Sequence, residues 1–235
     1  MQVRKRNVLS ICTLSVVATA CLALAPMATG KTSPMADTPG TPNEAIAALV
    51  AGNTRYINEK TELSNPAKAR KALAAGQAPF AAILRCADSR VAPEIVFDQP
   101  LGELFVCAVA GNIPTMEIIA SLEYGVAVLG TKVIVIMGHS SCGAVETAIK
   151  MRKDTSALPG SLPELIDQII IPCTVNSDPS DPKAMPRAVE CNANRGVESL
   201  MKRSSVIADA VKKGDLKVIA GVQDLATGRF SITSK

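Results

Sequence analysis

Four short runs of consecutive apolar residues constrain the fold of this chain more than any other feature of its sequence. They comprise residues 80–84 (FAAIL), 104–109 (LFVCAV), 132–137 (KVIVIM) and 216–222 (LKVIAGV). A strand with one face in water alternates apolar and polar residues, whereas a continuous apolar run is typical of a strand buried on both faces. Strands of that kind form parallel sheets covered by helices. The four runs therefore predict a central, mostly parallel β-sheet.

Segments with the apolar spacing of helices surround these runs. The predicted helices span residues 43–57, 66–75, 115–129, 143–151, 162–171 and 187–203, with a polar loop over 176–186. Alternating strands and helices indicate an α/β fold with right-handed crossovers. Thr227 and Gly228 predict a turn that folds residues 229–232 (RFSI) back as an antiparallel edge strand at the C-terminus. The sequence thus predicts a single α/β domain, with a mostly parallel central sheet flanked by helices.

The first 30 residues have the features of a secretory signal peptide. Cations at positions 4–6 precede an apolar stretch over residues 8–25, and small residues follow. Cleavage after Ala25 or after Gly30 is compatible with these small residues, and the sequence leaves that choice open. The apolar stretch has about the minimum length that spans a bilayer, so a retained N-terminal anchor is the alternative. We expect export to the periplasm or the extracellular space, without stable membrane insertion after cleavage.

Beyond the signal peptide the chain consists of a linker and a domain of nearly balanced charge. Residues 31–42 (KTSPMADTPGTP) form a flexible linker, and residues 43–235 form the folded domain. Residues 1–30 hold three of the 25 basic residues and no acidic one, so 22 basic residues remain against 21 acidic ones. A charge of +1 is too small for a nucleic-acid-binding surface. The aromatic content of 3% likewise excludes base-stacking platforms, so we expect no nucleic-acid partner.

His139 is the only histidine of the chain, which also contains seven cysteines. A single histidine excludes zinc sites with three His ligands and the HExxH proteases. Cys12 and Cys21 lie in the signal peptide, so five cysteines remain in the exported chain. Because five is an odd number, disulfides alone cannot use them all. Some of these cysteines must therefore be metal ligands or buried thiols.

Three residues that can bind a metal directly follow predicted strands. Cys86 follows the strand at 80–84, and His139 and Cys142 follow the strand at 132–137. Ligands bind beyond the carboxyl ends of parallel strands, so we expect these three side chains to converge. Two thiolates and one imidazole leave a fourth position free, which is typical of catalytic zinc. The alternative is that both cysteines are buried thiols and that His139 is a core histidine.

Asp88 and Arg90 lie in the same loop as Cys86. The side chains of residues two apart in an extended loop point the same way, so the carboxylate of Asp88 and the guanidinium of Arg90 can form an ion pair. A carboxylate so close to a zinc-binding cysteine can become the fourth ligand, whereas an arginine fork that binds it keeps it off the metal. Asp88 would then orient a zinc-bound water or hydroxide. The alternative is an ordinary ion pair within a loop.

At these residues the sequence resembles the β-class carbonic anhydrases. The resemblance covers nearly the whole chain after the linker, through residues 48–49, 52–53 and 56, CADSR at 86–90, GELFV at 102–106, AGN at 110–112, SLEY at 121–124, GHSSCGA at 138–144, and residues 224–225 and 227–228. The paired metal motifs are its most specific part. The resemblance implies reversible, zinc-dependent hydration of CO2 to bicarbonate and a proton by a zinc-bound hydroxide.

The resemblance also implies roles for single residues and an assembly. One Zn2+ per subunit is expected on Cys86, His139 and Cys142. Asp88 and Arg90 match the catalytic dyad of the family. The resemblance also implies that Asp88 can become the fourth ligand in a closed state, and it leads us to expect that Gly143 binds the substrate. The family forms homodimers or dimers of dimers, with active sites near the subunit interface.

The chemistry predicts how activity depends on pH. Zinc acidifies a bound water, but two thiolates cancel the charge of the ion, so we expect weaker acidification than with three neutral imidazoles. Activity should therefore rise with pH above neutrality. Since His139 is a metal ligand, protons must leave through carboxylates or buffer rather than through a histidine.

Two other functions remain open at this point. One is hydrolysis of a CO2 analogue, carbonyl sulfide or carbon disulfide, on the same scaffold. The other is a non-catalytic zinc-binding protein. Many members of the family carry arginine at the position of Ala108 and an aromatic residue near Gln223, where some bacterial members bind inhibitory bicarbonate. Because alanine cannot hold an anion, we do not expect that regulation here.

The remaining cysteines have simpler expected roles. Cys107 lies within a predicted strand and is expected to be a buried thiol. Cys173 and Cys191 flank the polar loop at 176–186, and in an oxidising compartment they can form a disulfide between two antiparallel helices. Two unrelated thiols are the alternative.

Overall fold

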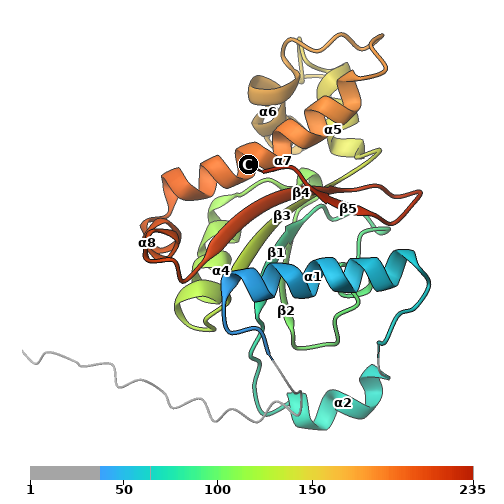
Figure 1. Cartoon of the computed structure of the whole chain (residues 1–235). Coiled ribbons are helices and arrows are strands. Elements are labelled where there is room, and N and C mark those ends of the chain that lie inside the picture. Colours follow the sequence, from blue (N-terminus) through green and yellow to red (C-terminus); the bar gives the residue numbers. More distant parts are fainter. Residues whose placement is uncertain (1–37, 64, 235) are drawn as a thin grey trace, which may run out of the picture. The chain divides into compact units, whose positions relative to one another are not determined.

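The computed structural model describes residues 38–63 and 65–234 (Figure 1). The predicted signal peptide and most of the predicted linker lie outside the described residues. Within the described ranges, no helix combines the length and the apolar character needed to cross a membrane.

A five-stranded sheet forms the centre of the domain. Its strands are β1 (Ala81–Arg85), β2 (Leu104–Ala108), β3 (Val133–His139), β4 (Lys217–Gln223) and β5 (Phe230–Ile232). They lie in the order β2-β1-β3-β4-β5, and every neighbouring pair is parallel except β4 and β5 (Figure 1). The predicted fold class, with its antiparallel edge strand at the C-terminus, is confirmed.

Strand β3 extends two residues further than predicted. The apolar run ends at Met137, which set the predicted boundary, but pairing with β4 continues through Gly138–Val222 and His139–Gln223. All seven residues of β3 are buried. His139 is therefore fixed by the sheet itself and is not part of the loop that follows.

The described part of the chain contains eight α-helices. They are α1 (Pro42–Ile57), α2 (Pro66–Leu73), α3 (Pro93–Val96), α4 (Met116–Ala127), α5 (Gly143–Lys150), α6 (Leu162–Ile169), α7 (Ala184–Arg203) and α8 (Ser205–Lys213). A 3-10 turn, η1 (Ala110–Asn112), follows β2, and a π-helical turn, η2 (Ile170–Thr174), follows α6.

The helix boundaries differ from the predicted ones in two places. Helix α7 begins at Ala184 rather than at residue 187, because Pro186 lies in the first turn, where its missing N–H is not needed. The sequence did not delimit helix α8, near whose end Lys212 and Lys213 lie exposed. The Ser204 side chain starts α8 by accepting a hydrogen bond from the N–H of Ile207 at 3.1 Å.

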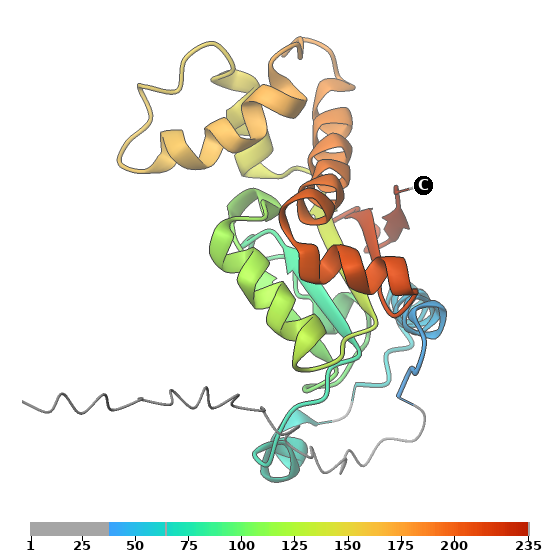
Figure 2. The same cartoon turned by 90° about the vertical axis from the view of Figure 1, so that its left-hand side faces the viewer.

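The helices cover both faces of the sheet. Helices α1 and α3 pack on one face around Phe97, Ile83 and Val135. Helices α4, α7 and α8 pack on the other face around Leu84 and Ile136, and Figures 1 and 2 show α1 on the opposite side of the sheet from α4. Both faces of β1 and β3 are therefore buried, as the continuous apolar runs predicted.

Helix α1 is fixed by one buried side chain, Asn53. Its Nδ2 donates to the carbonyl oxygens of Val96 at 3.0 Å and Gly228 at 2.9 Å, and its Oδ1 accepts from the N–H of Phe230 at 2.9 Å. Only 5% of Asn53 is exposed. This residue thus joins α1 to α3 and to the terminal strand β5.

Candidate metal centre

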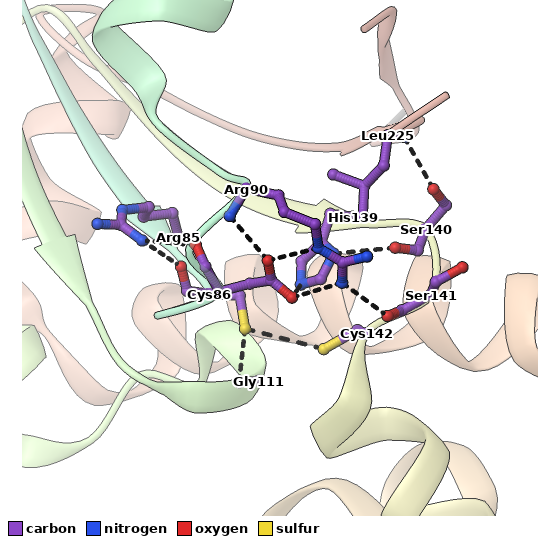
Figure 3. Close-up of polar contacts among 10 residues, drawn as sticks. Arg85, Cys86, Arg90, Gly111, His139, Ser140, Ser141, Cys142 and Leu225 are labelled. Atoms are coloured by element: carbon purple, nitrogen blue, oxygen red, sulfur yellow. Dashed lines mark hydrogen bonds and ion pairs between the residues drawn. The ribbon is translucent and has the colours of Figure 1, made fainter. Parts of the chain in front are cut away.

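The structure brings the three predicted metal ligands together. Cys86 directly follows β1, His139 ends β3, and Cys142 precedes α5. Because β1 and β3 are parallel neighbours, their carboxyl ends lie at the same edge of the sheet. The two sulfur atoms and one ring nitrogen all lie within 4.8 Å of one another, and all three residues are buried (Figure 3).

The turn between His139 and Cys142 is held by the neighbouring strand. The N–H of Ser140 donates to the carbonyl oxygen of Gln223 at 2.8 Å, and the Ser140 hydroxyl accepts from the N–H of Leu225 at 2.9 Å. Ser141 adopts a φ of 55°, in the left-handed region. This reversal turns the chain out of the sheet and places Cys142 at the N-terminus of α5.

The geometry of the three side chains fits a zinc ion. The Sγ atoms of Cys86 and Cys142 are 3.9 Å apart, and two sulfurs on a tetrahedral zinc ion would be separated by about 3.8 Å. The Nδ1–H of His139 donates to the carbonyl oxygen of Ser140 at 2.9 Å, which leaves the lone pair on Nε2. Nε2 is buried and has no hydrogen-bond partner among the described residues. Two sulfurs and one free ring nitrogen are the donor set that zinc prefers.

The two sulfurs are electrostatically coupled. Contact with the Cys142 thiol, followed by hydrogen bonds that include the N–H of Gly111 at 3.3 Å, lowers the pKa of Cys86. The same contact and burial raise the pKa of Cys142. A bound divalent cation would favour the thiolate form of both residues.

Asp88 and Arg90 form the predicted ion pair beside this group. The Nε of Arg90 donates to Asp88 Oδ1 at 2.9 Å and its Nη2 donates to Asp88 Oδ2 at 2.7 Å, so the contact is bidentate. The Arg90 side chain, and to a smaller extent its backbone N–H, holds the pKa of the Asp88 carboxyl well below its usual range. Asp88 Oδ2 is 3.9 Å from Nε2 of His139. The carboxylate therefore lies next to the candidate ligands while Arg90 engages both of its oxygens.

The other residues singled out from the sequence lie around this centre. Gly143 begins α5, and an added Cβ there would meet no atom within 4 Å, so the space beside it is open. Ala108 ends β2 and is exposed, whereas Gln223 is buried next to His139 in β4. Cys107 is buried, as expected, and burial raises its pKa to about 11.

The predicted disulfide is present. Cys173 in η2 is bonded to Cys191 in α7, with a sequence separation of 18 residues. The pair lies in a lobe built from α5, α6, η2 and the start of α7. The apolar cluster of this lobe also contains Cys86 and Cys142.

Sequence reasoning missed the residues that hold the candidate ligands through the backbone. Nη1 of Arg85 donates to the carbonyl oxygens of Cys86 at 2.7 Å and Asp88 at 3.3 Å. Gly111 donates to Cys86 Sγ, and Nδ2 of Asn192 donates to the carbonyl oxygen of Gly111. An arginine at the end of an otherwise apolar strand was a usable indication for Arg85. Asn192 gave none, because its partner is 81 residues away.

Comparisons with known proteins agree with this geometry. The carbonic anhydrase family matches residues 81–230. Carbonic anhydrase 2 of Mycobacterium tuberculosis is 36% identical over 189 residues, which cover 80% of this chain and 91% of that protein. The carbonic anhydrase of Mycolicibacterium smegmatis is 31% identical over 194 residues, 82% of this chain and 94% of that protein.

Solved structures show the same relationship. A Coccomyxa β-carbonic anhydrase in complex with acetazolamide superposes with a TM-score of 0.61 at 26% identity, covering 80% of this chain and 85% of that one. A structure reported among two tetrameric β-carbonic anhydrases of Sordaria macrospora superposes with a TM-score of 0.62 at 25% identity, covering 71% and 89%. With its fold, its Cys-His-Cys group and these matches, the chain belongs to the β class of the carbonic anhydrase family.

Proposed function

We propose that this protein is a zinc-dependent carbonic anhydrase, which hydrates CO2 reversibly to bicarbonate and a proton. The observation that carries the proposal is the convergence of Cys86, His139 and Cys142 beside an acid that Arg90 holds in place. A non-catalytic zinc protein has no need of that Asp88–Arg90 pair. Zinc at these ligands would supply a Lewis acid that makes water nucleophilic near neutral pH.

The residues of the chain then have distinct roles. Asp88 is a carboxylate throughout the physiological range, so it can accept a hydrogen bond from the reacting water and orient it toward CO2. Arg90 keeps Asp88 in this position, and its second contact, to the carbonyl oxygen of Ser141 at 3.4 Å, ties the pair to the turn before α5. The open space at Gly143 gives a small molecule access to the same edge. Since His139 is the only histidine, released protons leave through carboxylates or buffer.

Stopped-flow CO2 hydration on protein of measured metal content tests this function. We expect one zinc per subunit, activity that rises with pH above neutrality, and a loss of about 100-fold or more in kcat for Asp88→Asn. Asp209→Asn changes an exposed acid on α8 and should behave like wild type. Zinc-loaded protein that consumes carbonyl sulfide or carbon disulfide but not CO2 would refute the proposal, and so would a flat profile from about pH 6.5 to about pH 9.

We infer that the protein is a homodimer or a dimer of dimers. Strand β2 is an edge of the sheet: it pairs with β1 on one side and with no described strand on the other. Exposed edge strands pair readily with other chains. The exposed side chains of Ile95 and Leu101 lie just before β2 in the sequence. The related Sordaria enzymes are tetrameric. Light scattering after gel filtration should give two or four subunits, and a monomer at micromolar concentration would contradict the inference.

We propose that the protein is exported and acts in the periplasm or outside the cell. The basic, apolar and small-residue segments of residues 1–30 support export. The Cys173–Cys191 disulfide supports an oxidising compartment. Cell fractionation with N-terminal sequencing tests the proposal, since mature protein should begin after Ala25 or Gly30. Intact protein in the membrane fraction would favour the retained anchor instead.

A further inference from the structure

Gly111 connects the metal centre to helix α7 through two hydrogen bonds. Its N–H donates to Sγ of Cys86 at 3.3 Å, and its carbonyl oxygen accepts from Nδ2 of Asn192 at 2.7 Å. Asn192 lies within α7 and only 8% of it is exposed. Figure 3 shows Gly111 beside the Cys86 sulfur, on the side away from His139. A buried amide thus holds the residue whose N–H contacts a candidate metal ligand.

The position of Gly111 is tightly constrained. Its φ of 76° lies in the left-handed region, which glycine adopts readily. An added Cβ would lie 2.6 Å from Cδ1 of Ile169 in α6 and 3.4 Å from Cβ of Ala144 in α5. Two apolar side chains therefore close one side of Gly111, and the Asn192 amide binds its carbonyl oxygen. The direction of the Gly111 N–H depends on where α7 holds this peptide.

A hydrogen bond to a ligand sulfur changes how much charge that sulfur donates to a bound metal ion. An N–H···S contact stabilises the sulfur lone pairs, so the thiolate donates less charge to a bound cation. Groups that orient or polarise metal ligands in this way alter metal affinity by about 10–100-fold when they are removed. In this chain the N–H belongs to the backbone of Gly111, so the strength of the N–H···S contact depends on the residues that position this backbone.

We propose that Asn192 is a positioning residue of the metal centre. By binding the carbonyl oxygen of Gly111, it keeps the Gly111 N–H on the Cys86 sulfur and limits the charge that this sulfur donates to the cation. The proposal rests on the metal site of the proposed function. It assigns a role to a side chain that does not contact the candidate ligands.

The test uses the full chain loaded with cobalt(II), whose bonds to thiolate give charge-transfer absorption in the near ultraviolet. Asn192→Leu removes the donor at similar volume, and Asn192→Ala removes it without adding bulk. Both variants should move the sulfur-to-cobalt band to lower energy, because the sulfur lone pairs lose a stabilising hydrogen bond. Cobalt affinity, measured by chelator competition, should change by about 10–100-fold. Asn194→Leu is the matched control, because it removes an amide from the same helix whose contact is Thr233 at 3.1 Å.

The outcomes separate this inference from the proposed function. Wild-type protein without thiolate–cobalt absorption would refute the metal site itself. Folded Asn192 variants, verified by circular dichroism, that keep the wild-type band and affinity would overturn the role of Asn192 alone. An equal shift in Asn194→Leu would also overturn it, because the effect would then be a general loosening of α7. A shift confined to the Asn192 variants supports the proposal.

Discussion

Replacing the disulfide by two alanines, Cys173→Ala with Cys191→Ala, should reduce stability by an amount that follows from chain length. The bond closes a loop with a sequence separation of 18 residues. The chain-entropy relation for a loop of that size gives about 3 kcal/mol at 25 °C, because the cross-link restricts the unfolded chain. Both cysteines are partly exposed, so the substitution leaves no large cavity. For a domain of this size the loss corresponds to a fall in melting temperature of roughly 6–12 °C.

Urea unfolding of metal-free protein measures this loss without a contribution from metal binding. Wild type and the double variant are compared at equal protein concentration, since an oligomer unfolds in a concentration-dependent way. A phosphine reductant provides the control: it should bring wild type down to the double variant and leave the variant unchanged. Free energies of unfolding that agree within about 0.5 kcal/mol, a difference expected of neutral surface changes, would show that the loop-entropy argument is wrong here.

Three further substitutions test the site and the core. Arg90→Leu should lower kcat at least about tenfold while zinc stays bound, because Asp88 loses the guanidinium fork that holds it off the metal. Stopped-flow rates and metal analysis on one preparation measure kcat and zinc content, and undiminished activity would contradict the role of Arg90 in positioning Asp88. Cys107→Ala should remove part of the pH dependence of the free energy of unfolding. The thiol has a pKa of about 11 in the native state against an ordinary value of 9.0, so between these pH values the native state binds more protons than the unfolded state. Wild-type stability should therefore decline by up to about 3 kcal/mol as pH rises through that window, and the variant should lack this part in urea titrations. Asn53→Leu should lower stability by roughly 3 kcal/mol in the same assay, because three buried backbone groups lose their partner, whereas Thr54→Ala on the exposed face should cost less than about 1 kcal/mol.

The sheet could be predicted because its strands are apolar on both faces. Residues such as Ile83 and Val135 on one face, and Leu84 and Ile136 on the other, are completely buried. That burial leaves a continuous apolar run in the sequence, which needs no information about neighbouring elements. The exact end of β3 could not be read in this way, since His139 is polar and stays in the strand through its pairing with Gln223.

The short helices and the supporting contacts were not predictable from local patterns. Helix α3 has four residues, too few to show a period. The Arg85 contacts with the loop at Cys86 and Asp88 depend on how a side chain at the end of β1 folds back. The Asn192 contact depends on the packing of α7 against η1. Contacts between residues far apart in the sequence leave no periodic trace, although they decide where the ligands point.

The candidate ligands lie where the sheet meets the lobe of α5, α6, η2 and the start of α7. His139 belongs to the sheet, whose pairing fixes it from β4. Cys86 and Cys142 belong to the apolar cluster of the lobe that the Cys173–Cys191 disulfide closes. A cation bound by all three would therefore cross-link the sheet to the lobe, in addition to its chemical role. Because Asn192 extends from α7 to the same junction, the helix that carries the disulfide also positions the backbone at the metal centre.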